Sequence, residues 1–326
     1  MNAESLLSGI LPGTRSAAQL GTLFGETPSP QHDQQLVLSV DSLVDNVHFN
    51  ANSPLDALGY KCVAVNLSDM AAMGATPLAM HCAWGDPHDD PSWHDPVLAA
   101  IAQAAESLAV PVTFGQLSTV QRQITIQIMG TVPHGQALTR AGAHSGDQLW
   151  VSGTLGDAGA GLALQQGDLR ASTAKDCNYL LARLNRPTAR LELGQTLRGI
   201  ATAAIDISDG ITGDATHIAE QSQVGLRLFA HRLPLSDALV RVVGRSRAQR
   251  LALSAGEDYE LAFCAPANQE AQVRNAARRC QIPVHCVGDV VDGDAVLVLD
   301  ENAHPLDIPS AFDHFVDDSD CRETES

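Results

Sequence analysis

The spacing of apolar residues predicts regular elements in the first half of this 326-residue chain. Apolar positions three and four residues apart predict a helix over residues 54–74, and a second, Ala-rich helix is expected over about 96–109. Apolar runs predict strands that begin near residues 35, 77, 111 and 122, and the first should stop at Asp41-Ser42. A short helix is expected before Pro12-Gly13, with a polar loop over 22–34.

The second half starts after a Gly-rich polar segment near residue 145. A new strand is expected over 148–154, and glycine-rich turns, Ala/Leu helices and further strands follow it. Strands alternate with helices in both halves, which indicates an α/β or α+β protein. We therefore predict two domains, residues 1–145 and residues 146–326, the second ending in an acidic tail.

The composition limits the classes of binding partner and the cellular compartments that fit this chain. The net charge is −18 without any Lys/Arg-rich run, which disfavours nucleic acids and anionic membranes as partners. Seven irregularly spaced cysteines without a CxxC pair are typical of free thiols in a reducing compartment. With no secretory signal and no run of about 20 apolar residues, a cytoplasmic protein is expected.

Two carboxylates of the first half are candidate metal ligands. Asp41 follows a strand and could enter a cleft, although a turn or helix-cap role would also fit; His48, seven residues on, could be functional or structural. Asp69 interrupts the apolar face of the first predicted helix. A carboxylate there needs a cation or a partner, so the alternatives are a metal ion or a buried salt bridge with Lys61.

Two more acidic segments lie at turns of the second half. Asp206 and Asp209 share a glycine-containing strand-to-helix turn, where a divalent cation or a phosphate would relieve their repulsion; simple helix capping is the alternative. Glu257 lies in a Gly-Glu-Asp turn between a helix and a strand, where it could face a cleft or merely end the helix. The glycines of 153–161 lack the complete dinucleotide pattern and predict a tight turn entering a helix.

Taken in this order, the motifs resemble the thiamine-monophosphate kinase family over about residues 36–315. Two of the blocks also resemble the wider superfamily of aminoimidazole-ribotide synthetase and selenophosphate synthetase. The segments that carry the resemblance are SVDSLVDNVHF, YKCVAVNLSDMAAMGATP, GQALTRAGAHSGD, VSGTLGD, AIDISDGITGD, LSAGEDYELAF and FDHF.

The resemblance implies a fold, a reaction and roles for individual residues. It implies a two-domain fold of the aminoimidazole-ribotide-synthetase type with mixed sheets flanked by helices, a homodimer formed through the N-terminal domains, and Mg²⁺-assisted, in-line phosphorylation of thiamine monophosphate by ATP without a general base. The residues carried over are Asp41, Asp69, Asp206, Asp209 and Ser39 for Mg²⁺, Gly115, Arg140 and Ser208 for ATP, and His48, Glu257 and Phe312 for thiamine monophosphate.

The sequence departs from this family at several metal and nucleotide positions. The family's Gly-Asp-Asp element before the first strand is absent, where only Glu26 or Asp33 could substitute, and Gln116 replaces an Asp. A neutral amide is a poor Mg²⁺ ligand. Three hypotheses follow: a working kinase, a diverged paralogue that binds thiamine phosphate or a partner without catalysis, and an ATP-dependent enzyme with another acceptor.

Overall fold

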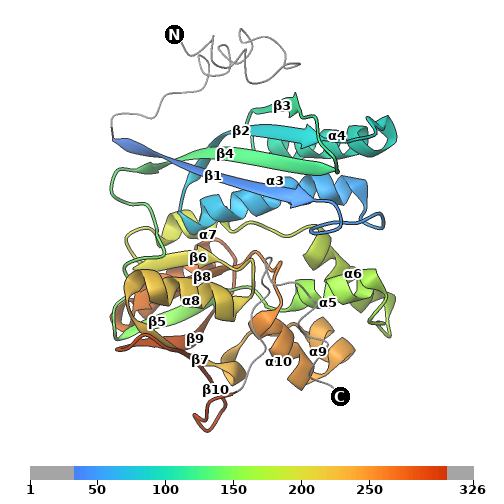
Figure 1. Ribbon diagram of the computed structural model, residues 1–326. Helices are drawn as coiled ribbons and strands as arrows, with labels where there is room; N and C mark the ends of the chain where they lie inside the picture. Colours follow the sequence, from blue (N-terminus) through green and yellow to red (C-terminus); the bar gives the residue numbers. More distant parts are fainter. Residues whose placement is uncertain (1–32, 307–326) are drawn as a thin grey trace.

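The chain folds into two mixed sheets, each covered by helices, as the computed structural model shows for residues 33–306 (Figure 1). The α/β class is therefore confirmed. In chain order the elements are β1 (Gln34–Val44), α3 (Leu55–Ala72), β2 (Thr76–Gly85), α4 (Pro91–Ser107), β3 (Val112–Gln116), β4 (Gln123–Pro133), β5 (Asp147–Ser152), α5 (Asp157–Gln166), α6 (Ala174–Asn185), α7 (Leu191–Leu197), β6 (Ala203–Asp206), α8 (Ile211–Ser222), β7 (Gly225–Phe229), α9 (Asp237–Val243), α10 (Arg245–Ser254), β8 (Leu261–Pro266), α11 (Glu270–Arg279), β9 (Val284–Val291) and β10 (Val296–Leu299).

The first sheet has the strand order β1-β4-β2-β3. β4 runs antiparallel to both β1 and β2, whereas β3 is parallel to β2. Alternation along β1 gives it two different faces, because Val37 is buried whereas Leu36, Leu38 and Val40 are exposed. Helices α3 and α4 pack against each other and close the core of this half.

The second sheet has the order β10-β7-β9-β5-β8-β6 and carries helices on both faces. One face packs against α8, whose Ile211 and Ile218 are fully buried. The other face packs against α7 and α11 around Trp150 and Phe263. The strands of this sheet are consequently apolar on both sides, as expected of a sheet between two helical layers.

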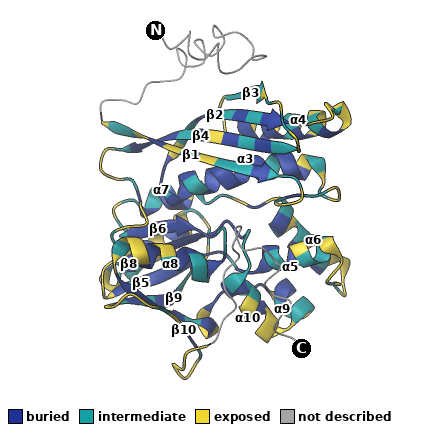
Figure 2. Cartoon of the chain, viewed as in Figure 1, coloured by how far each residue is buried: buried dark blue, intermediate teal, exposed yellow. Residues whose placement is uncertain are grey.

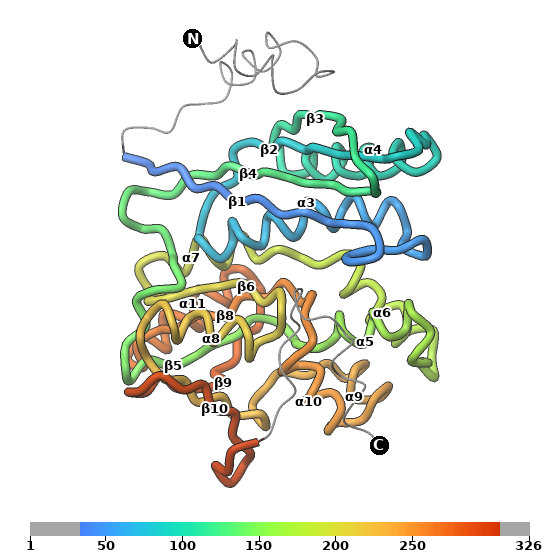
Figure 3. The backbone as a smooth tube through the Cα atoms, in the orientation of Figure 1, coloured from blue at the N-terminus to red at the C-terminus, as the bar shows by residue number. Residues whose placement is uncertain are grey.

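Helix α3 lies between the two sheets (Figure 3). Figure 2 shows it buried along most of its length. It contacts β1 and β4 of the first sheet as well as α7 and β6 of the second half. The approach of α7 is close: a Cβ on Gly194 would lie 1.9 Å from the carbonyl oxygen of Ala71, so only glycine fits there.

Two predicted boundaries were wrong. β1 continues past Asp41 to Val44, because the ladder with β4 extends to the pair Val44–Gln123. α4 begins at Pro91 instead of near residue 96, since the Asp90 side chain accepts from the Ser92 backbone N–H at 3.0 Å and a proline suits the first helical position.

Three further expectations concern the N-terminal segment, the domain boundary and membrane-spanning helices. The helix predicted before Pro12 and nearly all of the 22–34 loop lie outside the described residues. The domain boundary near residue 145 falls between β4 and β5 and stays a prediction. Over residues 33–306, no helix combines the length and apolar character needed to cross a bilayer.

Candidate active site

Two adjoining pockets lie where the two halves of the chain meet. The larger has a volume of about 420 Å³ and the smaller about 290 Å³. Asp41, Ser208 and Tyr259 line both, so the two pockets share a wall. We call the smaller one the acidic pocket, and the larger one the acceptor pocket, because the family resemblance would assign it to the phosphate acceptor.

The acidic pocket gathers side chains from β1, α3 and the end of β6. Its lining includes Ser39, Asp41, Asp69, Arg140 and Asp206. The Ser39 hydroxyl donates a hydrogen bond of 2.5 Å to Oδ2 of Asp69, which ties β1 to α3 at this point. Residues far apart in the sequence, predicted separately as metal or nucleotide contacts, are thus brought into one site.

The carboxylates of the acidic pocket disfavour one another's ionisation. Burial raises the pKa of Asp206 to about 7, and the nearby charge of Asp69 acts in the same direction. Burial also raises the pKa of Asp69, against the opposing effect of the hydrogen bond from Ser39. A bound cation would reverse both effects by stabilising the ionised forms.

The turn between β6 and α8 is held by a carboxylate that sequence reasoning missed. Oδ2 of Asp214 accepts from the backbone N–H groups of Ser208 at 3.1 Å and Asp209 at 3.2 Å. Gly210 supplies the positive φ of 104° that the turn needs. This arrangement presents Asp209 to the acceptor pocket beside Ser208. The position of Asp214 in the first turn of α8 was the available signal.

The carboxylate oxygens of the acidic pocket fit a hard divalent cation that is also bound by the phosphates of a substrate. The acidic side chains of the pocket offer only oxygen atoms, which Mg²⁺ prefers. Within residues 33–306, no three His, Cys, Asp or Glu side chains are grouped closely enough to hold an ion by themselves. Mg²⁺ commonly uses only one or two carboxylates together with waters and substrate phosphates, so such a group is not required.

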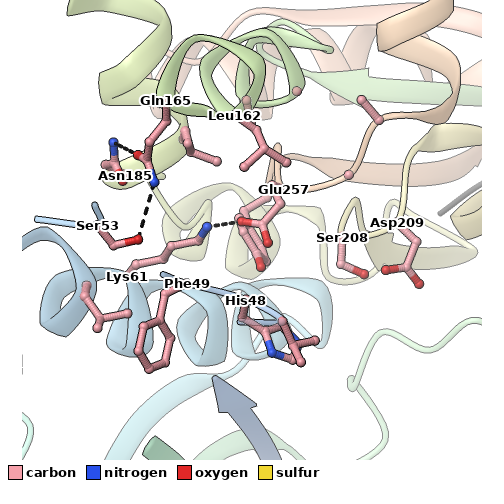
Figure 4. A pocket seen from close by; sticks show the side chains of 18 of the residues that line it. His48, Phe49, Ser53, Lys61, Leu162, Gln165, Asn185, Ser208, Asp209 and Glu257 are labelled. Carbon is pink, nitrogen blue, oxygen red and sulfur yellow. Dashed lines mark hydrogen bonds and ion pairs between the residues drawn. The ribbon is translucent and has the colours of Figure 1, made fainter. Parts of the chain in front are cut away.

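The acceptor pocket has an ion pair in its middle. Lys61 from α3 pairs with Glu257 from the segment between α10 and β8 (Figure 4). The alternative prediction of a salt bridge between Lys61 and Asp69 was therefore wrong, because the lysine points to the other pocket. His48 and Phe49 also line this pocket.

Glu257 is held in an unusual backbone conformation. Its φ is +75°, a region that non-glycine residues rarely adopt. Its N–H donates to the Ser208 carbonyl at 2.8 Å, and the N–H of Tyr259 donates to Ile207 at 2.9 Å. A Cβ on Gly256 would lie 2.2 Å from the Ser208 oxygen. The 256–259 segment is thus fastened to the Asp209 turn, which fixes both acidic groups relative to each other.

The next two acidic residues after Glu257 hold the structure around the site in place. Asp258 accepts from the backbone N–H of Gly156 at 2.6 Å and of Ala158 at 3.3 Å, which caps the N-terminus of α5. Glu260 is fully buried and binds Arg183 and Arg190. Sequence reasoning assigned a role to neither residue.

We expect the stability of Asp258→Asn relative to the wild type to increase as the pH rises. Burial raises the pKa of Asp258 to about 7, above the ordinary value of about 3.9 for an unfolded chain. The folded state therefore binds this proton more tightly, and the stability it contributes is complete below about pH 4 and lost as the pH rises through about 7. Asparagine does not titrate.

The measurement is the free energy of urea unfolding of both proteins at pH 5 and pH 8. The value for the variant minus that for the wild type should increase toward pH 8. The exposed Asp168→Asn serves as the control, with a difference that stays nearly constant. A difference for Asp258→Asn that falls with pH would contradict the assignment.

Several predicted site residues lie elsewhere. Gly115 and Gln116, at the end of β3, line neither pocket, and Gln116 donates to Asp89 at 3.0 Å instead. Asp33 precedes β1, and eight extended residues separate it from Asp41 by about 25 Å, so the two cannot share an ion. Glu26 and Phe312 lie outside the described residues.

Two family models match the chain. Residues 18–133 match AIR synthase related protein, N-terminal domain, and residues 144–300 match AIR synthase related protein, C-terminal domain. Among characterised proteins, the thiamine-monophosphate kinase of Escherichia coli K12 is 38% identical over 283 residues, covering 86% of this chain and 87% of the relative. That of Haemophilus influenzae is 36% identical over 292 residues, with 88% of each chain covered.

Solved structures agree with these matches. The thiamine-monophosphate kinase of Stenotrophomonas maltophilia K279a superposes with a TM-score of 0.78 at 37% identity, covering 85% of this chain and 88% of that one. AaThiL complexed with AMPPCP and TMP superposes with a TM-score of 0.76 at 28% identity, covering 93% and 100%. The fold predicted from the sequence is confirmed.

Proposed function

Because the chain belongs to the thiamine-monophosphate kinase family, we propose that it transfers the γ-phosphoryl group of ATP to thiamine monophosphate, giving ADP and thiamine diphosphate. The observation that carries this proposal is the shared wall of the two pockets. An acidic pocket suited to metal-bound phosphates opens beside a larger pocket suited to an organic acceptor, with Asp41 and Ser208 between them.

In this proposal the acidic pocket holds the phosphates of both substrates. Asp41, Asp69, Asp206 and Asp209, with Ser39, would hold Mg²⁺, which neutralises the charge of the phosphates being brought together. Arg140, which lines the same pocket, and the Ser208 hydroxyl would contact the nucleotide.

No side chain is needed as a general base. The attacking atom is an oxygen of an already ionised phosphate, so positioning and charge neutralisation suffice for in-line transfer. The fastening of the Glu257 segment to the Asp209 turn supports this reading, because it fixes the acceptor pocket relative to the acidic one. The chain thereby holds the acceptor and the donor phosphates at a constant separation.

On the acceptor side, His48 and Glu257 would contact thiamine monophosphate. Both line the acceptor pocket, and a carboxylate suits the cationic thiazolium ring. The roles carried over to Gly115 and Phe312 stay predictions, since the first lies outside both pockets and the second outside the described residues.

We also propose a homodimer formed through the first sheet. Its β1 strand exposes Leu36, Leu38 and Val40 in a row on the face opposite the buried Val37. A contiguous row of exposed aliphatic side chains is characteristic of a surface that is covered by a partner, and a second copy of this sheet would match it in length and polarity.

The test is single-turnover transfer from γ-labelled ATP to thiamine phosphate at millimolar Mg²⁺, with the Asp209→Asn variant as the control for contaminating kinase. We expect labelled thiamine diphosphate from the wild type and a loss of at least about a hundredfold in the variant. Transfer that is equal in both proteins would refute the proposal. Calorimetric binding of thiamine phosphate without any transfer would favour the alternative of a binding paralogue, which rests on Gln116 and on the distance of Asp33.

A further inference from the structure

A chain of polar side chains closes the end of the acceptor pocket that lies away from the acidic pocket. In Figure 4, Ser53, Gln165 and Asn185 lie on one side of the Lys61–Glu257 pair, and Ser208 and Asp209 lie on the other. The three polar residues come from the loop before α3, from α5 and from the end of α6. We call them the amide wall.

Hydrogen bonds fix the orientation of the amide wall. Nδ2 of Asn185 donates to Oε1 of Gln165 at 3.1 Å, and Nε2 of Gln165 donates to the Ser53 hydroxyl at 3.3 Å. The Ser53 oxygen also accepts from the backbone N–H of Asn50 at 3.1 Å. This chain ties the two amides and the hydroxyl together across three elements.

The wall keeps donors and acceptors for a bound molecule. Each side-chain amide has two donor hydrogens and an acceptor oxygen. Inside the wall, Gln165 and Asn185 each use one donor, and no group of the described chain donates to Oδ1 of Asn185. A second donor on each amide and this oxygen therefore remain, so the wall can offer a donor and an acceptor side by side.

The surroundings of the wall are apolar and neutral. Leu58, Leu162 and Leu184 line the same pocket, and they suit the faces of a flat ring. Among the charged groups of the pocket, Lys61 and Glu257 pair with each other in its middle, whereas Asp41 and Asp209 lie on the side of the acidic pocket. The end at the amide wall thus favours an uncharged heteroaromatic ring with polar atoms on its edge.

We propose that Gln165 and Asn185 determine specificity by hydrogen bonding to the aminopyrimidine ring of thiamine phosphate. This inference rests on the proposed function. Along the substrate, phosphate, cationic thiazolium and neutral aminopyrimidine follow one another, and along the pocket the acidic side chains, Glu257 and the amide wall follow in the same order. The exocyclic amine is a donor and the ring nitrogen beside it an acceptor, which complements the two amides.

The test compares thiamine phosphate with the phosphorylated hydroxyethylthiazole that lacks the pyrimidine. Gln165→Met keeps the size of the side chain and removes its hydrogen bonds, and Gln166→Met, exposed on the same helix, is the matched control. We expect KM and the calorimetric Kd for thiamine phosphate to rise about tenfold in Gln165→Met, with kcat within about twofold and the Kd of the thiazole phosphate unchanged. Asn185→Ala, checked for folding by thermal melting, should change KM, Kd and kcat in the same way as Gln165→Met.

The outcomes separate this inference from the proposed function. Equal weakening of both ligands, or no change for thiamine phosphate in an active enzyme, would overturn the role of the amide wall while leaving the kinase intact. Selective weakening of thiamine phosphate binding in a protein that transfers no phosphate would support the wall and overturn the kinase. A wild-type protein that does not bind thiamine phosphate would overturn both.

Discussion

Replacing Asp69 by Asn should lower the rate of phosphate transfer by about 10²–10³-fold while the Kd for thiamine phosphate changes little. The carboxylate accepts the 2.5 Å hydrogen bond from Ser39 and lies beside Asp206 in the acidic pocket. Asparagine keeps the shape and one acceptor but removes a negative charge from the proposed Mg²⁺ ligands. Single-turnover transfer and calorimetry on the same preparation measure the two quantities.

The exposed Asp168→Asn, which lines neither pocket, controls for the loss of one surface charge. Raising the Mg²⁺ concentration should recover part of the Asp69→Asn rate, because a weakened ion site fills at higher concentration. A rate within about threefold of the wild type at low Mg²⁺ would show that Asp69 is not a ligand of the Mg²⁺ that neutralises the reacting phosphates.

The largest effect on stability is expected from Glu260→Ala, which should lower the free energy of unfolding by about 3–5 kcal/mol. The Glu260 carboxylate accepts from Nη2 of Arg183 at 3.0 Å, from Nε of Arg190 at 2.6 Å and from the Ser152 hydroxyl at 2.5 Å. Truncation leaves Arg190 without this carboxylate and Arg183 with only the longer pair to Asp157, at 3.6 Å, although both guanidinium groups are largely buried. Urea unfolding followed by circular dichroism gives the value.

Glu106→Ala, on the exposed surface of α4, is the matched control and should change the free energy of unfolding by less than about 0.5 kcal/mol. Glu260→Gln should lower the free energy of unfolding by an amount between those of Glu260→Ala and Glu106→Ala, because the amide keeps an acceptor but loses the charge. An unfolding free energy for Glu260→Ala within 1 kcal/mol of the wild type would mean that the two arginines find other partners.

Local patterns were sufficient for most of the elements and for the candidate aspartates, whereas the serines and the arginine of the acidic pocket were assigned only through the family resemblance. Asp69 was recognisable because a carboxylate on an apolar helical face needs an explanation, and Asp206 with Asp209 because two acids share one turn. The turn that ends at Gly156 and the helix α5 after it also follow from local glycine spacing. Each of these signals is contained in a stretch of about ten consecutive residues.

Partners across long sequence separations could not be predicted. Lys61 pairs with Glu257, a contact that depends on how the two halves are placed, and Glu260 binds Ser152, a contact that depends on the pairing of β5 with β8. The amide wall was missed for the same reason, because Gln165 and Asn185 are ordinary polar residues at helix ends until their helices meet. Gly115, assigned through the family resemblance, lines neither pocket, and its role stays a prediction.

The burial of α3 in both halves has a consequence for folding. Its Val63, Leu67 and Met70 pack with the first sheet, whereas Ala71 and Ala72 pack with Trp150 and other residues of the second. A chain cut near residue 145 would leave one fragment with an uncovered helix and the other with an uncovered cluster. The two sheets therefore share a cooperative unit, and heating the intact protein should melt them in a single transition.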